Sequence, residues 1–113
     1  MKERRKKTVE AKLAYRISDR IRKNLRSNKF KKCRGTKDIL GCTVQELKVY
    51  LEKQFTPQMN WGNHGTKGWH IDHIKPLSLA KTEEEIYKLW HYTNLQPLWW
   101  IDNIKKGNKY EEK

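Results

Sequence analysis

Apolar residues are scarce in this chain, and that scarcity limits the folds that it can adopt. Only 35% of its 113 residues are hydrophobic, which is enough for one core and too few to divide between two. Five tryptophans and five tyrosines supply much of the apolar surface. Large aromatic rings bury the most area per residue, so we expect one small domain with most of these rings packed inside.

Positive charge is concentrated at the N-terminus. Residues 1–37 carry 16 Lys and Arg against 3 acidic residues, whereas residues 38–113 carry 10 of each sign. A segment of this charge favours a polyanion, because each neutralised phosphate releases counterions, and double-stranded DNA is the first candidate partner. A solvated basic tail and a helix lying on a membrane surface are the alternatives. We divide the chain into a basic arm and helix, residues 1–37, and a domain, residues 38–113.

The two cysteines, Cys33 and Cys42, are not spaced as a CxxC pair, so this chain cannot build a four-thiolate structural zinc site. No apolar run approaches the length of a membrane span, and no signal-like hydrophobic segment follows the basic start. The sequence therefore predicts a soluble, cytoplasmic protein without a membrane partner. Its thiols should be reduced, and Cys42 should pack as a small apolar residue.

A helix with one apolar stripe is predicted close to the N-terminus. From about Ala11 onward, apolar residues recur at every fourth position, namely Leu13, Ile17, Ile21 and Leu25. This period is typical of a helix that docks on a core by a single face. The other faces carry basic residues that could bind phosphate groups, namely Arg16, Arg20 and Lys23.

Two capping boxes predict two further helices, because a threonine and a glutamate three residues later can satisfy the first unpaired N–H groups of a helix. Residues 43–46 (TVQE) form the first, and its helix should end before Pro57. Residues 82–85 (TEEE) form the second, and its helix should reach about His91. Residues 29–41 are basic and interrupted by glycine, and no element is assigned to them.

A short strand is predicted at residues 69–74, where apolar and polar residues alternate imperfectly. In an extended segment His70 and Asp72 would point to one face, and His73 would lie at or beyond the strand end. Residues 94–98 contain a proline and are too short for a central strand, so a brief edge strand or a loop is expected there.

The last helix should cover about residues 98–106 and end at Gly107, which is well placed as a C-terminal cap. Few strands are predicted beside several helices. The fold class is therefore α+β, as a small and mainly helical domain.

The C-terminal half offers a group for each task in phosphodiester hydrolysis, which needs an activated nucleophile and a cation on the phosphoryl oxygens. Asp72 is a hard oxygen ligand, and the adjacent His73 can take a proton from water at neutral pH. The carbonyl oxygen of Asn103 is a neutral ligand that suits Mg²⁺ or Mn²⁺ better than Zn²⁺ or Ni²⁺. Lys105 and Lys106 can reach a phosphate as point charges.

Three clusters of residues carry a resemblance to a known family: Asp72-His73-Ile74, Asn94-Leu95-Gln96-Pro97-Leu98, and Asn103 followed by Lys105, Lys106 and Gly107. Together they resemble the HNH endonucleases of small phage and prophage type, in the variant whose last histidine is replaced by asparagine. The motif covers about residues 69–107. The run from Leu40 to Gly62 is also similar to the N-terminal portion of such proteins.

The resemblance implies a ββα-metal core at about residues 69–107, with Asp72 and Asn103 as ligands of one divalent ion, Mg²⁺ or Mn²⁺. His73 would be the general base, and Asn94 would fix the loop between the strands and orient the histidine. The implied activity is hydrolysis of double-stranded DNA by nicking or double-strand cleavage, which leaves 5′-phosphate and 3′-hydroxyl ends. A phage or prophage origin, and a homodimer or a terminase-like partner, are also implied.

One departure from the family is that many small phage members hold a structural zinc with two CxxC pairs. This chain has none, so the aromatic core and the helices must hold its fold. Two other functions are weighed beside the endonuclease. The first is a catalytically weak nucleic-acid-binding accessory protein of a phage DNA packaging or processing machine, and the second is an RNA-binding protein.

Each of the remaining histidines could bind a ligand or stabilise the fold. His70 could add a metal ligand or a phosphate contact, or it could be a hydrogen-bonded histidine beside Trp69. His64 lies in a glycine-rich loop and could touch DNA, while His91 could cap the carbonyls at the end of its helix.

Overall fold

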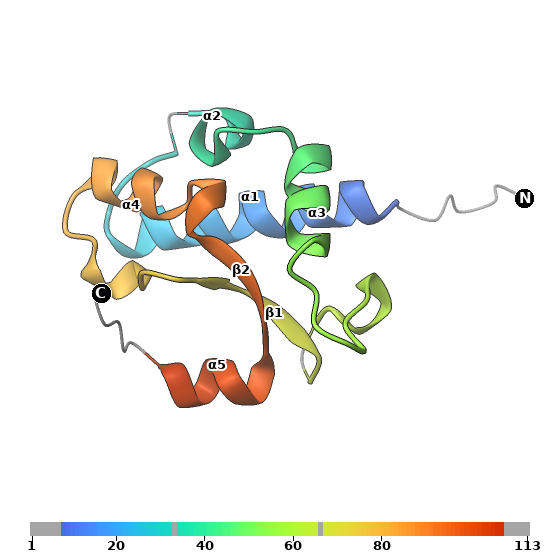
Figure 1. Cartoon of the computed structure of the whole chain (residues 1–113). Coiled ribbons are helices and arrows are strands. Elements are labelled where there is room, and N and C mark those ends of the chain that lie inside the picture. The colour runs from blue at the N-terminus through green and yellow to red at the C-terminus, as the bar shows by residue number, and fades with distance from the viewer. Residues whose placement is uncertain (1–7, 33, 66, 108–113) are drawn as a thin grey trace, which may run out of the picture.

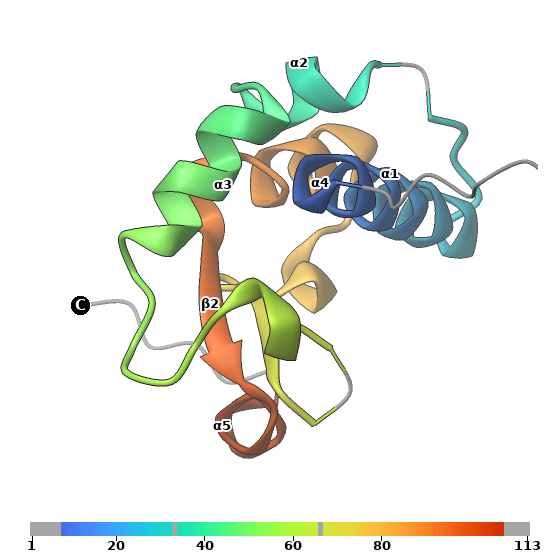
Figure 2. The same cartoon turned by 90° about the vertical axis from the view of Figure 1, so that its right-hand side faces the viewer.

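The computed structural model describes residues 8–32, 34–65 and 67–107. Its elements follow the order α1 (Val9–Ser27), α2 (Thr36–Leu40), α3 (Val44–Glu52), β1 (Trp69–His73), α4 (Glu83–Leu89), β2 (Leu95–Trp99) and α5 (Trp100–Lys106). Figures 1 and 2 show α1, α3 and α4 gathered on one side of the two strands, whereas α5 lies apart from them and follows directly from β2. The described part of the chain is thus an α+β domain in which helices predominate, as the sequence predicts.

The two strands pair antiparallel, with Asp72 opposite Gln96 and His73 opposite Leu95. A two-stranded sheet is marginally stable by itself, so it depends on the helices that pack against it. Helix α5 contacts both strands, and α3 contacts β2. The connection between the strands is long and contains α4, which the sequence predicts at this place.

Helix α1 belongs to the core of the domain. Its predicted stripe is at most 1% exposed and consists of Leu13, Ile17, Ile21 and Leu25. The stripe joins one apolar cluster with residues of α2, α3, α4 and both strands, including the fully buried Trp69 and Trp90. The helix therefore docks by one face, as predicted, and its apolar stripe is not available to a membrane surface. No helix in the described ranges is long and apolar enough to cross a membrane.

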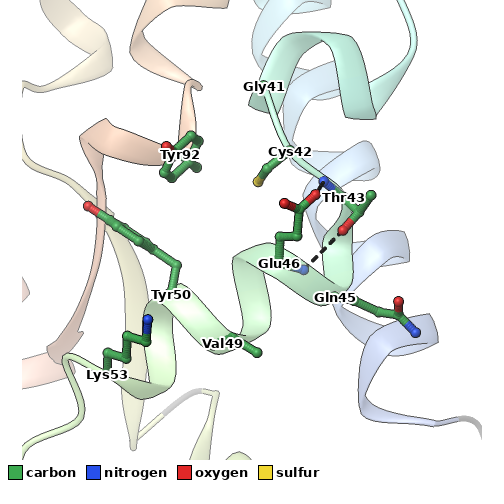
Figure 3. Close-up of a pocket in the computed structure, with 9 residues that line it drawn as sticks. All are labelled: Gly41, Cys42, Thr43, Gln45, Glu46, Val49, Tyr50, Lys53 and Tyr92. Carbon is green, nitrogen blue, oxygen red and sulfur yellow. Dashed lines mark hydrogen bonds between the residues drawn. The ribbon is translucent and has the colours of Figure 1, made fainter.

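The capping signals locate the starts of α3 and α4. At α3, Thr43 Oγ1 accepts a hydrogen bond from the Glu46 N–H at 3.0 Å, and Glu46 Oε1 accepts one from the Thr43 N–H at 3.0 Å (Figure 3). At α4, Thr82 Oγ1 accepts from the Glu85 N–H at 3.1 Å. The glutamate of this second box bonds the Thr82 hydroxyl instead of the Thr82 N–H. Both helices therefore begin where the sequence predicts.

Helix ends and short elements differ from the sequence prediction. Helix α3 ends at Glu52, well before Pro57, because Phe55 leaves the helix and packs against Trp61 and Trp69 with ring centroids 5.5 and 5.0 Å away. Helix α2 was not predicted. It is five residues long and has no side-chain cap, so its sequence carries little helix signal.

Helix α4 also ends early, at Leu89, and His91 does not cap its carbonyls. The imidazole of His91 instead caps the next turn, Tyr92–Asn94, and its Nδ1 lies 2.8 Å from Thr93 Oγ1. Residues 95–99 form the edge strand that the sequence left undecided, and α5 consequently starts at Trp100 and not at residue 98. Cys42 is buried as predicted, and burial raises the pKa of its thiol, whereas Cys33 lies outside the described residues.

Because the stripe of α1 is buried in the core, truncating it should destabilise the whole domain. We expect Ile21→Ala to lower the free energy of unfolding by about 2–4 kcal/mol, the usual cost of removing a buried aliphatic side chain. Urea denaturation would measure this change. The matched control is Arg22→Ala on an exposed position of the same helix, which should stay within about 0.5 kcal/mol of the wild type. Equally small effects of both substitutions would contradict the packing of α1.

Candidate functional site

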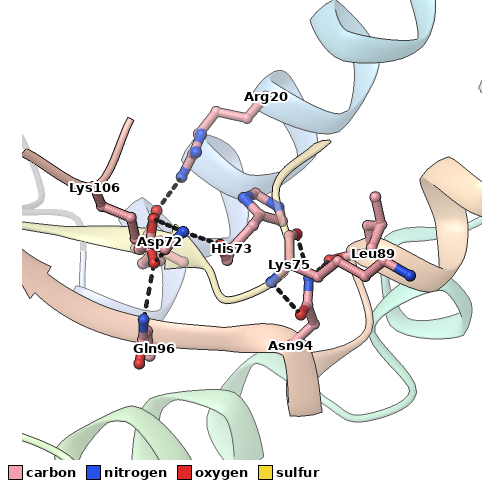
Figure 4. A network of polar contacts seen from close by, with 9 residues as sticks. Arg20, Asp72, His73, Lys75, Leu89, Asn94, Gln96 and Lys106 are labelled. Carbon is pink, nitrogen blue, oxygen red and sulfur yellow. Dashed lines mark hydrogen bonds and ion pairs between the residues drawn. The ribbon is translucent and has the colours of Figure 1, made fainter. Parts of the chain in front are cut away.

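Asp72 places a carboxylate inside the domain, where its side chain is 7% exposed. Its Oδ2 accepts a hydrogen bond from Gln96 Nε2 at 2.9 Å, across the antiparallel pair (Figure 4). The ammonium of Lys106, on the last residue of α5, lies 3.3 Å from Oδ1 and 3.2 Å from Oδ2. Both carboxylate oxygens therefore have a partner, which a buried charge requires.

His73 ends β1 and is also buried, at 6% exposure. Its ring meets the indole of Trp90 edge to face, with centroids 4.2 Å apart. The Nε2 atom is shut off from solvent and has no hydrogen-bond partner among the described residues. Burial first, and then the nearby cations of Arg20 and Lys106, lower the pKa of this imidazole from 6.5 to about 3. The ring is therefore neutral at neutral pH.

Asn94 fixes the loop that follows His73. Its Oδ1 accepts a hydrogen bond from the Lys75 N–H at 2.9 Å, and its Nδ2 donates to the carbonyl oxygens of Lys75 and Leu89 at 3.1 and 2.8 Å. Its own carbonyl accepts from the Ile74 N–H at 2.8 Å. One asparagine thus ties the end of β1 to the end of α4 and the start of β2 (Figure 4), the loop-fixing position that the sequence predicts.

Asn103 lies on α5 and reaches the same place. A hollow of about 160 Å³ is lined by Asp72, His73 and Asn103, together with Arg20 and Lys106. Helix α5 is held there because the Trp100 N–H donates to the Gly68 carbonyl oxygen at 2.9 Å, at the beginning of β1. The fold therefore brings together the two predicted metal ligands and the predicted base, although they are about 30 residues apart in the chain.

The donor set of this hollow restricts the cations that it could hold. Among the described residues, no three His, Cys, Asp or Glu side chains gather closely enough to bind a metal by themselves. One carboxylate and one amide oxygen could hold a hard cation that keeps part of its water shell. They do not match the imidazole and thiolate sites that zinc prefers. The ion pair between the Lys106 ammonium and Asp72 shows that this carboxylate attracts a cation.

Of the residues of α1 that are predicted to bind phosphate, two line a hollow and one does not. Arg16 and Arg20 line a second hollow of about 540 Å³ next to the first, together with His64, His70 and Asn103. The Arg20 guanidinium donates to the Ile71 carbonyl oxygen at 3.2 Å and lies 5.1 Å from the centroid of the Trp90 ring. Lys23 pairs with Asp19 at 2.9 Å and lines neither hollow.

The two lysines of α5 also differ. Lys105 is exposed, so its ammonium can approach a ligand from solvent. Lys106, which the sequence predicts to reach a phosphate, is held inward, since its ammonium donates to the His73 carbonyl oxygen at 2.7 Å as well as contacting Asp72.

His70 adopts the hydrogen-bonded alternative. Its Nε2 lies 2.7 Å from the Gly65 carbonyl oxygen, which ties β1 to the preceding loop. His64 stacks on Trp69 with ring centroids 4.2 Å apart and an interplanar angle of 15°. Its Nδ1 lies 3.1 Å from a guanidinium nitrogen of Arg16. Both histidines therefore build the wall of the larger hollow.

Sequence reasoning missed two residues of the site, Gln96 and Trp90. Gln96 is the single polar side chain in β2, but its place opposite Asp72 follows from the strand register, which the sequence alone does not show. Trp90 follows α4 in the sequence and gave no sign that it would pack against His73. A further hollow of about 520 Å³ beside α3, lined by Tyr50, Lys53 and Tyr92, includes none of the site residues (Figure 3).

His64, which stacks on Trp69 in the wall of the larger hollow, should make the stability of the fold sensitive to acid. Burial first, and then Arg16, His70 and Arg20, lower the pKa of His64 from 6.5 to about 4. Between these two pH values the unfolded chain binds a proton on this residue and the folded chain does not, so stability falls as the pH falls from 6.5 to 4. We expect His64→Phe, which retains a ring against Trp69, to reduce this loss. Melting temperatures measured from pH 8 to pH 4 would test this, and curves that stay parallel throughout would refute it.

Comparison with known proteins finds two viral relatives, both from Acanthamoeba polyphaga mimivirus. Uncharacterized protein L426 is 32% identical over 101 residues, which cover 82% of this chain and 44% of that protein. Uncharacterized protein L246 is 33% identical over 121 aligned residues, which cover 96% of this chain and 52% of that protein. The chain thus spans about half the length of the curated relatives it matches. No protein-family profile matches the chain, and no solved structure matches it significantly.

Proposed function

We propose that this chain is a metal-dependent endonuclease of the HNH type, which hydrolyses phosphodiester bonds in double-stranded DNA. The observation that carries the proposal is the convergence of Asp72, His73 and Asn103 on one hollow, built from two antiparallel strands and the helix that follows them. Asn94 fixes the loop between the strands. These features support the proposal of a ββα-metal core.

One divalent ion, Mg²⁺ or Mn²⁺, would be held by Asp72 and Asn103 and would keep several waters. When bound, it supplies positive charge to the phosphoryl oxygens of the substrate. The donor set fits such a hard ion, and the buried carboxylate that already attracts an ammonium supports it. Zn²⁺ and Ni²⁺ fit less well, because the hollow offers a single imidazole and that imidazole is assigned to the base.

His73 would take the proton from the attacking water. The ring is neutral at neutral pH because burial and two cations hold its pKa to about 3. Because Nε2 is shut off from solvent, the proposal assigns this proton to Nδ1. A phosphate bound in the hollow would offset the charges of Arg20 and Lys106, which are the smaller causes of the low pKa after burial.

Binding of DNA would rest on the basic N-terminal segment. Arg16 and Arg20 flank the second hollow, next to the candidate ligands, and are suited to phosphate oxygens. The excess positive charge of residues 1–37 would also attract DNA over a longer range. Nothing in this surface marks a helix that reads bases, so contacts with the phosphate backbone would dominate.

The accessory-protein alternative has one observation in its favour, which is that Lys106 occupies the Asp72 carboxylate. A chain in which that ion pair is permanent would bind DNA without cutting it. Cleavage assays separate the two functions directly.

Plasmid cleavage tests the proposed base. We expect the purified protein with Mg²⁺ or Mn²⁺ to nick or linearise plasmid, and EDTA to stop the reaction. His73→Ala should reduce the rate by about a hundredfold or more, the usual contribution of a general base, while DNA affinity changes by less than about twofold. His91→Ala is the control, since this imidazole caps a turn outside the hollow. Cleavage that survives in the His73→Ala protein would exclude the mechanism.

Salt dependence tests the role of the basic segment. Removing residues 1–7 deletes five basic residues and leaves Thr8, the N-terminal cap of α1, in place. The plot of log affinity against log salt concentration should become shallower by about one unit for each phosphate contact that is lost. Fluorescence anisotropy with a short DNA duplex would measure it. An unchanged slope would mean that these residues do not touch phosphate.

A further inference from the structure

The ammonium of Lys106 is enclosed by three oxygen atoms. It lies 3.3 and 3.2 Å from the two carboxylate oxygens of Asp72 and 2.7 Å from the carbonyl oxygen of His73. A lysine ammonium carries three N–H donors, so these contacts can use its whole hydrogen-bonding capacity. The ammonium is therefore a cationic partner of both carboxylate oxygens of Asp72.

We propose that Lys106 is a resident counter-cation of Asp72 which a divalent metal ion must displace before it can bind. The inference rests on the proposed function in taking Asp72 as a metal ligand. In the metal-free protein the ammonium closes the ligand position. Metal binding opens it, and the Lys106 side chain then turns away from the carboxylate.

Competition follows from the geometry of the hollow. A metal ion bound to either oxygen of Asp72 would lie beside the ammonium, and the two positive charges would repel each other. The Lys106 side chain is only 21% exposed and that of Asp72 only 7%, so water screens this repulsion less than it would at an open surface. The two cations therefore exclude each other at this carboxylate.

The position of Lys106 in the fold makes its displacement possible. It is the last residue of α5 and is followed by Gly107, which caps the helix with a positive φ of 52°. The long lysine stem can change rotamer without any shift of the strands that hold Asp72. The hydrogen bond from Gln96 remains to orient the carboxylate. The displaced ammonium would then be available to a phosphate oxygen, which is the contact that the sequence predicts for it.

Metal titrations of variants in which one lysine is replaced by the uncharged methionine test the displacement. Mn²⁺ affinity would be measured by electron paramagnetic resonance on the wild type, Lys106→Met and Lys105→Met. Lys105 is the matched control because it is the neighbouring lysine on the same helix, is exposed, and contributes the same long-range charge. We expect Lys106→Met to bind Mn²⁺ about tenfold more tightly than the wild type, and Lys105→Met to differ by less than about twofold.

Asp72→Asn separates the failure of this inference from the failure of the proposed function. If Mn²⁺ binds the wild type and Asp72→Asn equally, or binds neither the wild type nor Lys106→Met, Asp72 is not a ligand and both proposals are wrong. If binding depends on Asp72 while Lys106→Met binds no more tightly than the wild type, only the displacement is wrong and the metal site stands.

A second measurement needs no substitution at Lys106 and so does not depend on the folding of that variant. Mg²⁺ would be added to the wild-type protein while the lysine Cε signals are followed by nuclear magnetic resonance. Displacement predicts a change in the Lys106 signal that saturates with the metal site and is absent in Asp72→Asn. A Lys106 signal that stays constant while Mg²⁺ binds would overturn the inference.

Discussion

The buried carboxylate of Asp72 is the constraint on which the arrangement of this half of the domain depends. A charge removed from water costs several kcal/mol unless it is paired, and Asp72 obtains its partners from two other elements, Gln96 on β2 and Lys106 on α5. The strand pairing is therefore fixed by polar contacts as well as by packing. A shift of β2 by one residue would turn Gln96 to the opposite face of the sheet and leave one carboxylate oxygen without its donor.

Helix α1 supplies what the small sheet lacks. Two strands alone would not be stable, and the stripe of α1 completes the core against which they pack. The same helix carries Arg16 to the loop before β1 and Arg20 to the Ile71 carbonyl oxygen. Its charged face is thereby held next to Asp72 and His73 by the packing of its apolar face. One helix therefore supplies both the apolar side chains that complete the core and basic side chains that line the hollows.

The sequence predicted the features that depend on local signals. The apolar period predicted α1, and the threonine caps predicted the starts of α3 and α4, because each signal lies within the element itself. Helix α2 and the short strand β2 have weak local signals and form through their tertiary contacts. In the candidate site, the resemblance to HNH endonucleases led us to expect Asp72, His73 and Asn103 close together, and the fold brings them to one hollow. Gln96, Trp90 and the inward turn of Lys106 depend on register and packing, which no local pattern encodes.

The environment of His73 shows how the same charges could serve two states of the protein. Without a substrate, burial and the cations of Arg20 and Lys106 keep the ring neutral, and Nε2 has no hydrogen-bond partner in the described part of the chain. A buried polar atom without a partner lowers stability. Under the proposed function, a bound phosphate would pair with those cations and remove the main charges that oppose protonation of the ring. Pairing with phosphate would weaken the charge contribution to the low pKa of His73, while burial, its largest cause, would remain.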